Sequence, residues 1–179
     1  MRQAADTNLE NAKKHLGWKA AALTERFARG IPGDMILYTT RPGVQLRGLC
    51  HLQRQREYLD VQYAGVKLAN PSMSHKEIIK NLWGNPSQSV CRVPKPTSER
   101  GVGVITTSTS LYSFERDCVI SGEGLLNLHG WDKHVAPLER FNENACRSLA
   151  GDSVSVPIAA LMQCAMVYNP HAAWWRGGQ

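Results

Sequence analysis

The apolar positions near the start of the chain recur with a helical period. From residue 8 to residue 29 they fall three or four positions apart, which places them on one face of a helix. The members of this face are Leu9, Ala12, Leu16, Ala20, Leu23 and Phe27. The segment Gly30-Ile-Pro-Gly33 ends the helix, because proline and glycine do not extend its hydrogen-bond ladder. Residues 35–39 are compatible with a short strand or an extended loop.

A second helix is predicted from Gln45 to Ala69. Its apolar stripe consists of Leu49, Leu52, Leu59, Tyr63 and Val66. It ends at Asn70, since the residue before a proline avoids the helical region. Ser74 and Glu77 then have the spacing of a capping box, which predicts a third, short helix. This third helix is expected to hold Ile78, Ile79, Leu82 and Trp83.

The second half of the chain mixes strand and helix signals. Residues 84–100 are rich in Pro, Ser, Asn and Gly and are predicted to form a loop. Short strands are predicted at 102–107 and 111–114. A helix is expected to begin at Ser121, carry Leu125, Leu126 and Leu128, and stop at Gly130, and a final helix begins near Ser153. The predicted fold class is therefore mixed α/β, mostly helical with a few short strands.

Charge is divided unevenly along the chain. Residues 1–100 hold 16 Lys and Arg against 8 Asp and Glu, a net +8, whereas residues 101–179 hold 5 against 7, a net −2, which together give the total of +6. A basic half favours contact with a polyanion such as DNA. Arg92, Lys95 and Arg100 are the candidate DNA-binding residues. A solvated, lysine-rich surface explains the same charges, so both interpretations stay open.

Several classes of protein find no support in the sequence. The 5 cysteines lack the close pairing of a zinc site or a disulfide framework, so we expect no metal and reduced thiols. No apolar run is long enough for a transmembrane helix, and no secretory signal is recognisable at the start. We expect an intracellular protein, nuclear if the source is eukaryotic and otherwise cytoplasmic. Phosphate-binding glycine loops, His-Glu-x-x-His helices and Gly-x-Ser-x-Gly elbows are absent from the sequence.

An ordered series of segments lies between Gly101 and Tyr168. The segment from Ile120 to Trp131 ends in Leu128-His-Gly-Trp131. After a gap comes Gly151-Asp-Ser-Val154, followed by Pro157 and an apolar stretch. This order resembles the carboxy-terminal end of DNA cytosine-5 methyltransferases. Their ninth conserved motif ends in Leu-Gln-Gly-Phe, and their tenth is Gly-Asn-Ser-Val with a following proline.

The resemblance implies a fold, a cofactor and a partner. The chain would be an incomplete piece of a Rossmann-like methyltransferase fold, with residues 1–100 as a possible target-recognition region, 101–170 as the methyltransferase-like segment and 171–179 as a tail. Gly151, Asp152, Ser153 and Val154 would line the S-adenosylmethionine site, and DNA would be the substrate. The simpler interpretation of this stretch is a turn into a helix, with Asp152 or Ser153 as its N-cap.

The resemblance also implies that the chain is inactive alone. The family attaches a cysteine thiolate of a Pro-Cys motif to a flipped-out cytosine, assisted by the glutamate of a Glu-Asn-Val motif. Neither string occurs in this sequence, so no residue is nominated as catalytic. Whether the chain is an enzyme thus stays open, and a second chain would have to supply the missing motifs. The alternatives are a non-catalytic DNA-binding or protein-interaction module, and an unrelated small α/β protein.

Overall fold

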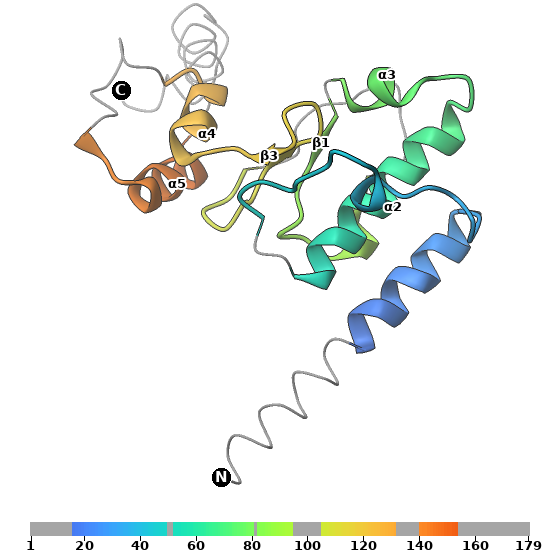
Figure 1. Cartoon of the computed structure of the whole chain (residues 1–179). Coiled ribbons are helices and arrows are strands. Elements are labelled where there is room, and N and C mark those ends of the chain that lie inside the picture. Colours follow the sequence, from blue (N-terminus) through green and yellow to red (C-terminus); the bar gives the residue numbers. More distant parts are fainter. Residues whose placement is uncertain (1–15, 50–51, 81, 95–104, 132–139, 154–179) are drawn as a thin grey trace, which may run out of the picture. The chain divides into compact units, whose positions relative to one another are not determined.

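The computed structural model describes residues 16–49, 52–80, 82–94, 105–131 and 140–153. The chain divides into two compact units. Unit 1 comprises Met1–Val104 and Thr109–Ile120, and unit 2 comprises Ile105–Ser108 and Ser121–Gln179. Across the described residues the fold is mixed α/β, with helices and one small antiparallel sheet, as the sequence predicts (Figure 1).

Helix α2, Gln53–Ala69, is the centre of unit 1, and the other elements of this unit gather around it (Figure 1). Every residue from Tyr58 to Val66 is buried, so no side of α2 is exposed to solvent over this stretch. The predicted start at Gln45 is wrong. Leu46 and Gly48 have φ values of 56° and 72°, which lie outside the helical region, and Arg47 instead bridges to Cys118.

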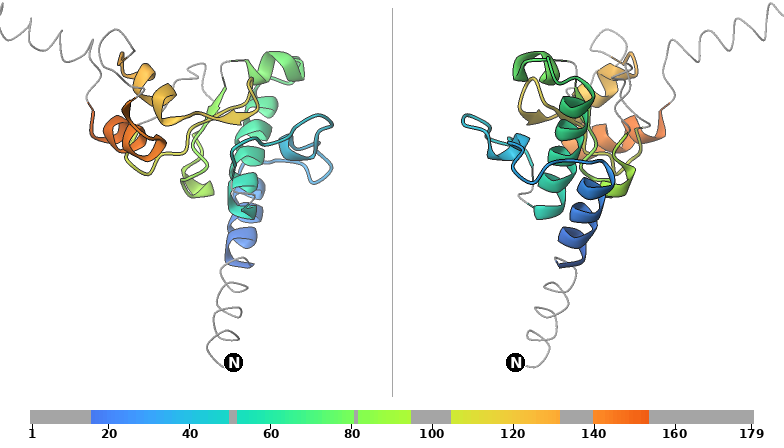
Figure 2. Two further views of the ribbon diagram at one scale, coloured as in Figure 1. Left: turned by 60° about the vertical axis from the view of Figure 1, so that its left-hand side comes forward. Right: turned by 90° about the vertical axis from the view of Figure 1, so that its right-hand side faces the viewer.

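The predicted amino-terminal helix is confirmed for residues 16–28, which lie beside α2 (Figure 2). Its apolar stripe faces solvent, however, since Leu16, Leu23 and Phe27 are 65%, 55% and 89% exposed. The side that meets α2 carries Ala22, 1% exposed, and Arg26, which pairs with a carboxylate of α2. Small and ionic side chains, rather than large apolar ones, therefore fix this helix in unit 1.

Helix α3, His75–Ile79, begins as predicted, with a complete capping box between Ser74 and Glu77. It ends earlier than expected. Leu82 is buried outside the helix, and Trp83 opens strand β1, Trp83–Gly84. A side chain at Gly84 would lie 2.7 Å from the Gln62 side-chain oxygen, so the close approach of this strand to α2 requires glycine.

The sheet has three two-residue strands in the order β1-β2-β3, all antiparallel. Strand β2, Tyr112–Ser113, confirms the prediction for residues 111–114. Strand β3, Cys118–Val119, has no counterpart in the sequence analysis. The predicted strand at 102–107 is not observed at residues 105–107, and residues 102–104 lie outside the described part.

Tyrosine side chains form the interior of unit 1. Tyr38 lies in the 3-10 helix η1, Tyr38–Thr40, where the sequence left strand or loop open. Its ring meets Phe114 at 4.7 Å between centroids, and its hydroxyl lies 3.2 Å from that of Tyr112. Both hydroxyls donate to the carboxylate of Asp117, and burial raises the pKa of both phenols, so they remain protonated donors.

Asp117 joins three parts of unit 1. Besides the tyrosine hydroxyls, its carboxylate accepts the backbone N–H groups of Gln45 at 2.6 Å and Leu46 at 3.2 Å. Its φ of 50° lies in the left-handed region that aspartate tolerates in turns. A residue in the turn between β2 and β3 therefore also holds the segment that precedes α2.

Unit 2 contains helices α4, Gly122–Leu128, and α5, Glu143–Asp152. Helix α4 is the one predicted from Ser121 to Gly130. Helix α5 was not predicted, because only Cys146 and Ala150 among its residues are buried. The final helix expected from Ser153 onward lies outside the described residues.

Candidate functional site

The segment Leu128-His-Gly-Trp131 forms the carboxy-terminal cap of α4. Gly130 has a φ of 83°, its N–H donates to the Asn127 carbonyl, and the Trp131 N–H donates to the Leu126 carbonyl. This pair of bonds is the Schellman motif, which satisfies carbonyls that a helix end leaves free. The glycine of this signature is therefore explained by backbone geometry.

Two side-chain nitrogens beside this cap are buried without a hydrogen-bond partner. They are Nε2 of His129 and Nε1 of Trp131. Each unsatisfied buried polar atom costs about 1–3 kcal/mol. These two unsatisfied nitrogens therefore reduce the free energy that unit 2 gains from burying the His129 and Trp131 side chains.

Helices α4 and α5 meet at Gly122. A side chain there would lie 2.7 Å from the Cβ of Cys146 and 2.7 Å from the carbonyl oxygen of Glu143. The Gly122 N–H donates to the Glu143 carboxylate, at 2.9 and 3.0 Å from its two oxygens. Glu143 also pairs with Arg147 at 2.7 Å. A carboxylate at the start of α5 therefore neutralises the positive end of α4.

Gly151 is in still closer contact with the chain. A Cβ on this residue would lie 2.0 Å from the backbone nitrogen of Thr107 and 2.3 Å from its Cα. Residues 105–108 are thereby packed against the end of α5 and belong to unit 2. Glycine is required here because another backbone occupies the space of a side chain.

The four predicted cofactor-binding residues are only partly described. Gly151 and Asp152 end α5, and Ser153 is its C-cap. Asp152 is exposed. Val154 lies outside the described residues. The three described residues are therefore consecutive at one helix end, with Gly151 half-buried against Thr107 and Asp152 exposed to solvent.

Of the three predicted DNA-binding residues, only Arg92 is described. It ends the 3-10 helix η2, Val90–Arg92, and its exposed side chain donates to Gln88 at 3.2 Å. The segment 84–100, predicted to be an irregular loop, thus contains the end of β1 and the 3-10 helix η2 in its described part. Lys95 and Arg100 lie outside the described residues.

Basic side chains of unit 1 make ion pairs and hydrogen bonds within the unit. Arg26 pairs with Glu57 at 2.5 Å and lies 3.7 Å from Asp60, while Arg29 donates to the carbonyl oxygens of Val93 and Pro94. Part of the positive charge in the first hundred residues is therefore structural. Periodicity misses this role, because an arginine on a helix looks the same whether its partner is solvent or a carboxylate.

Asp60 is the most perturbed carboxyl of this group. Burial raises its pKa to about 6, although the N–H and hydroxyl of Thr39 and the charge of Arg26 act in the opposite direction. At neutral pH this carboxyl is close to its titration range, inside a unit whose core it helps to form.

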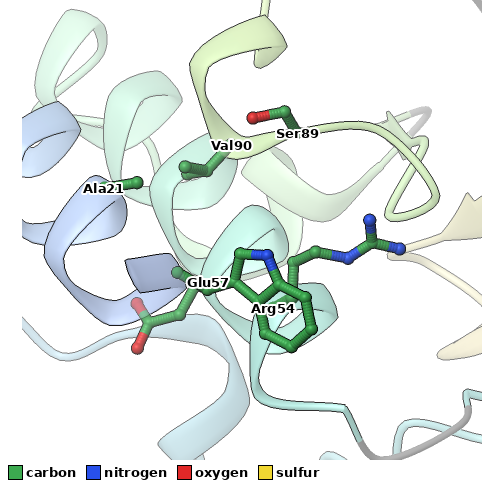
Figure 3. A pocket seen from close by; sticks show the side chains of 6 residues that line it. Ala21, Arg54, Glu57, Ser89 and Val90 are labelled. Carbon is green, nitrogen blue, oxygen red and sulfur yellow. The ribbon is translucent and has the colours of Figure 1, made fainter. Parts of the chain in front are cut away.

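A small pocket of about 80 Å³ lies where α2, η2 and the helix at 16–28 meet. Arg54 and Glu57 of α2 extend toward different sides of it, and Ala21, Ser89 and Val90 complete the wall (Figure 3). The guanidinium of Arg54 lies 5.8 Å from the ring centre of Trp18. Sites for cofactors usually enclose about 300–1,000 Å³, so this pocket does not accommodate S-adenosylmethionine.

The described part of the chain contains neither a candidate metal site nor a helix that could span a membrane. No group of three or more His, Cys, Asp or Glu side chains there could hold a metal ion. None of the described helices has the length and apolar character needed to span a bilayer. Cys91, Cys118 and Cys146 are free thiols, and burial raises the pKa of Cys146.

No protein-family model, curated protein or solved structure matches this chain significantly.

Proposed function

We propose that the chain is the carboxy-terminal part of a DNA cytosine-5 methyltransferase and does not transfer a methyl group by itself. In the family that it resembles, the ninth-motif helix supports the target-recognition region and the tenth motif lies beside the S-adenosylmethionine pocket. The chain would supply these supporting elements, and a second polypeptide would supply the Pro-Cys nucleophile and the Glu-Asn-Val carboxylate.

One observation carries the proposal. The segment that resembles the ninth motif forms α4 and its cap, and the first two residues of the segment that resembles the tenth motif, Gly151 and Asp152, end α5, which packs against α4 in unit 2. Gly122 and Glu143 join the starts of the two helices, and Gly151 ends the second. Two neighbouring motifs of one scaffold are expected to meet in one compact unit, as these two helices do.

The missing residues define what the chain contributes. C5 of cytosine becomes nucleophilic only after a thiolate adds to C6 of a base that has left the helix. S-adenosylmethionine supplies the methyl group. Neither a Pro-Cys nor a Glu-Asn-Val string is present, so the chain can position a cofactor or DNA but cannot perform the addition.

Complementation tests this proposal. Purified chain, double-stranded DNA and tritium-labelled S-adenosylmethionine should give no labelled DNA. Adding the catalytic half of a cytosine-5 methyltransferase, with both missing motifs, should produce label, and the same half with alanine in place of its Pro-Cys cysteine should not. Label from the chain alone, or none after complementation, contradicts the proposal.

A further inference from the structure

Arg41 is a half-buried cation without a counter-ion among the described residues. Its Nε atom is buried and has no hydrogen-bond partner. None of the ion pairs in the described part of the chain includes it. Buried charges in proteins are normally paired, because removing an ion from water without compensation is costly.

The guanidinium of Arg41 lies over an aromatic ring. Its central carbon is 5.0 Å from the ring centre of Tyr63 in α2. A cation–π contact of this kind restricts the orientation of the guanidinium, and a planar guanidinium fork is suited to a bidentate acceptor. The backbone of Arg41 is fixed as well, since its N–H donates to the carbonyl oxygen of Tyr38 at the end of η1.

A histidine and a phenol complete the cluster. The Tyr63 hydroxyl lies 3.0 Å from Nδ1 of His75, the first residue of α3. Burial and the charge of Arg41 together lower the pKa of His75. Burial raises the pKa of Tyr63, and Arg41 opposes that rise. No carboxylate is among the causes of either shift.

We propose that Arg41 and His75 bind a phosphate group of the DNA backbone, while the fully buried Tyr63 positions both side chains. The guanidinium fork matches two phosphate oxygens, and the half-buried imidazole of His75 supplies a further donor through the ring nitrogen that does not face Tyr63. The inference depends on the proposed function for DNA as the source of the phosphate. It adds Arg41 and His75, which neither periodicity nor the family resemblance identifies.

The test compares two substitutions at Arg41 with a matched control. Arg41→Gln removes the charge, Arg41→Lys keeps it without the planar fork, and Arg116→Gln removes a charge from an exposed site in unit 1. Affinity for a double-stranded oligonucleotide is measured by fluorescence anisotropy over a salt series. Loss of one phosphate contact lowers the slope of log affinity against log salt by about 0.9.

We expect this loss for Arg41→Gln, a largely retained slope for Arg41→Lys, and a smaller change for Arg116→Gln. A wild-type slope in Arg41→Gln, or equal losses in Arg41→Gln and Arg116→Gln, overturns the site while leaving DNA binding by the chain intact. Thermal unfolding by circular dichroism establishes that each variant is folded at the temperature of the assay.

A second arm separates the site from the proposed function. Inorganic phosphate is titrated into the wild-type chain and into Arg41→Gln, and the ring signals of His75 are followed by NMR. A saturable shift in the wild type that is absent in Arg41→Gln supports an anion site, even where the chain fails to bind DNA and the proposed function falls. No shift in the wild type, together with no DNA binding, overturns the inference.

Discussion

In unit 1 a long helix is buried on nearly every side and brings polar groups into the interior, whereas in unit 2 two short helices meet at glycines that leave no room for a side chain. Asp60 and Glu57 lie on α2 among tyrosines and leucines, with Arg26 and Thr39 as partners. Gly122 and Gly151 have backbone or Cβ atoms of another segment within 3 Å of where their side chains would be. Unit 1 therefore depends on hydrogen bonds and ion pairs between polar groups in its interior, and unit 2 on close approach of backbones.

This difference predicts how each unit responds to substitution. A unit that depends on buried polar groups is sensitive to pH and to loss of a single hydroxyl, because an unsatisfied partner remains behind. A unit that depends on close contacts is sensitive to added volume, since packed backbone cannot move aside cheaply. Four substitutions test these expectations, beginning with the largest effect.

Gly151→Ala should be the most damaging change in unit 2. The new methyl group would lie 2.0 Å from the backbone of Thr107, so α5 and residues 105–108 cannot keep their contact. We expect a loss of about 3 kcal/mol or more, at the upper end of overpacking effects. Hydrogen exchange should show faster exchange in α5 and unchanged exchange in α2. Gly33→Ala, where nothing lies within 4 Å of the added methyl group, is the control.

Asp60→Asn should change the pH dependence of unit 1. The folded-state pKa of about 6 exceeds the ordinary value of 3.8, so the protonated carboxyl is the favoured form in the fold. Its contribution to stability is complete below the unfolded-state value and is lost as pH rises through 6. The whole shift corresponds to about 3 kcal/mol, of which about 2.4 kcal/mol is lost between pH 4 and pH 7.5.

Urea unfolding at several pH values measures this dependence. In Asp60→Asn the loss of stability between pH 4 and pH 7.5 should largely disappear, and the variant should unfold at higher urea than the wild type at pH 7.5. Asp34→Asn, at an exposed position, should keep the wild-type slope. Identical slopes in the wild type and Asp60→Asn would show that burial of this carboxyl carries no such cost.

Tyr112→Phe should destabilise unit 1 by about 2 kcal/mol, since a hydrogen bond to a charged group is worth about 1.5–3 kcal/mol. The hydroxyl donates to Asp117 and contacts Tyr38, and its loss leaves the carboxylate with one donor fewer. Tyr63→Phe removes a hydroxyl that meets a neutral imidazole and should cost less. Equal losses in the two variants, measured by urea unfolding, would argue against a special role for Asp117.

The sequence predicts elements well where local chemistry decides them. The capping box of Ser74 and Glu77, the start of α4 at Ser121 and its stop at Gly130 are all confirmed, because each depends on bonds within a few residues. The coarse mixed α/β class follows from the same signals. Long-range packing is where prediction fails.

The helix at residues 16–28 illustrates this failure. Its spacing of Leu16, Leu23 and Phe27 indicates a helix, and the helix is present, but the apolar side is exposed and the small side is packed. Periodicity states that a face is apolar and says nothing of which face a neighbour covers. Helix α5 was missed for the opposite reason, as its contact with α4 at Gly122 involves Cys146 and backbone atoms, which leave little hydrophobic pattern.

The candidate sites divide in the same way. Gly151 was nominated by resemblance, and its packing against Thr107 gives it a structural reason that no local signal contains. Arg41 was not nominated, because a single arginine after a turn resembles any solvated residue until Tyr63 and His75 are brought beside it. Residues that act through neighbours distant in sequence become visible only in the fold.

Glu143→Gln is the mildest of the four changes and tests the polar part of unit 2. The carboxylate accepts the Gly122 N–H and pairs with Arg147, so it caps α4 from outside that helix. An amide keeps the shape and one acceptor but loses the charge that complements the helix end, and a loss of about 1 kcal/mol is expected. Glu123→Gln, on an exposed residue in the first turn of α4, is the matched control. Exchange rates of the amides in α4 measure the effect. If Glu143→Gln proves as costly as Gly151→Ala, unit 2 depends on charge as much as on close contact, and the contrast between the two units disappears.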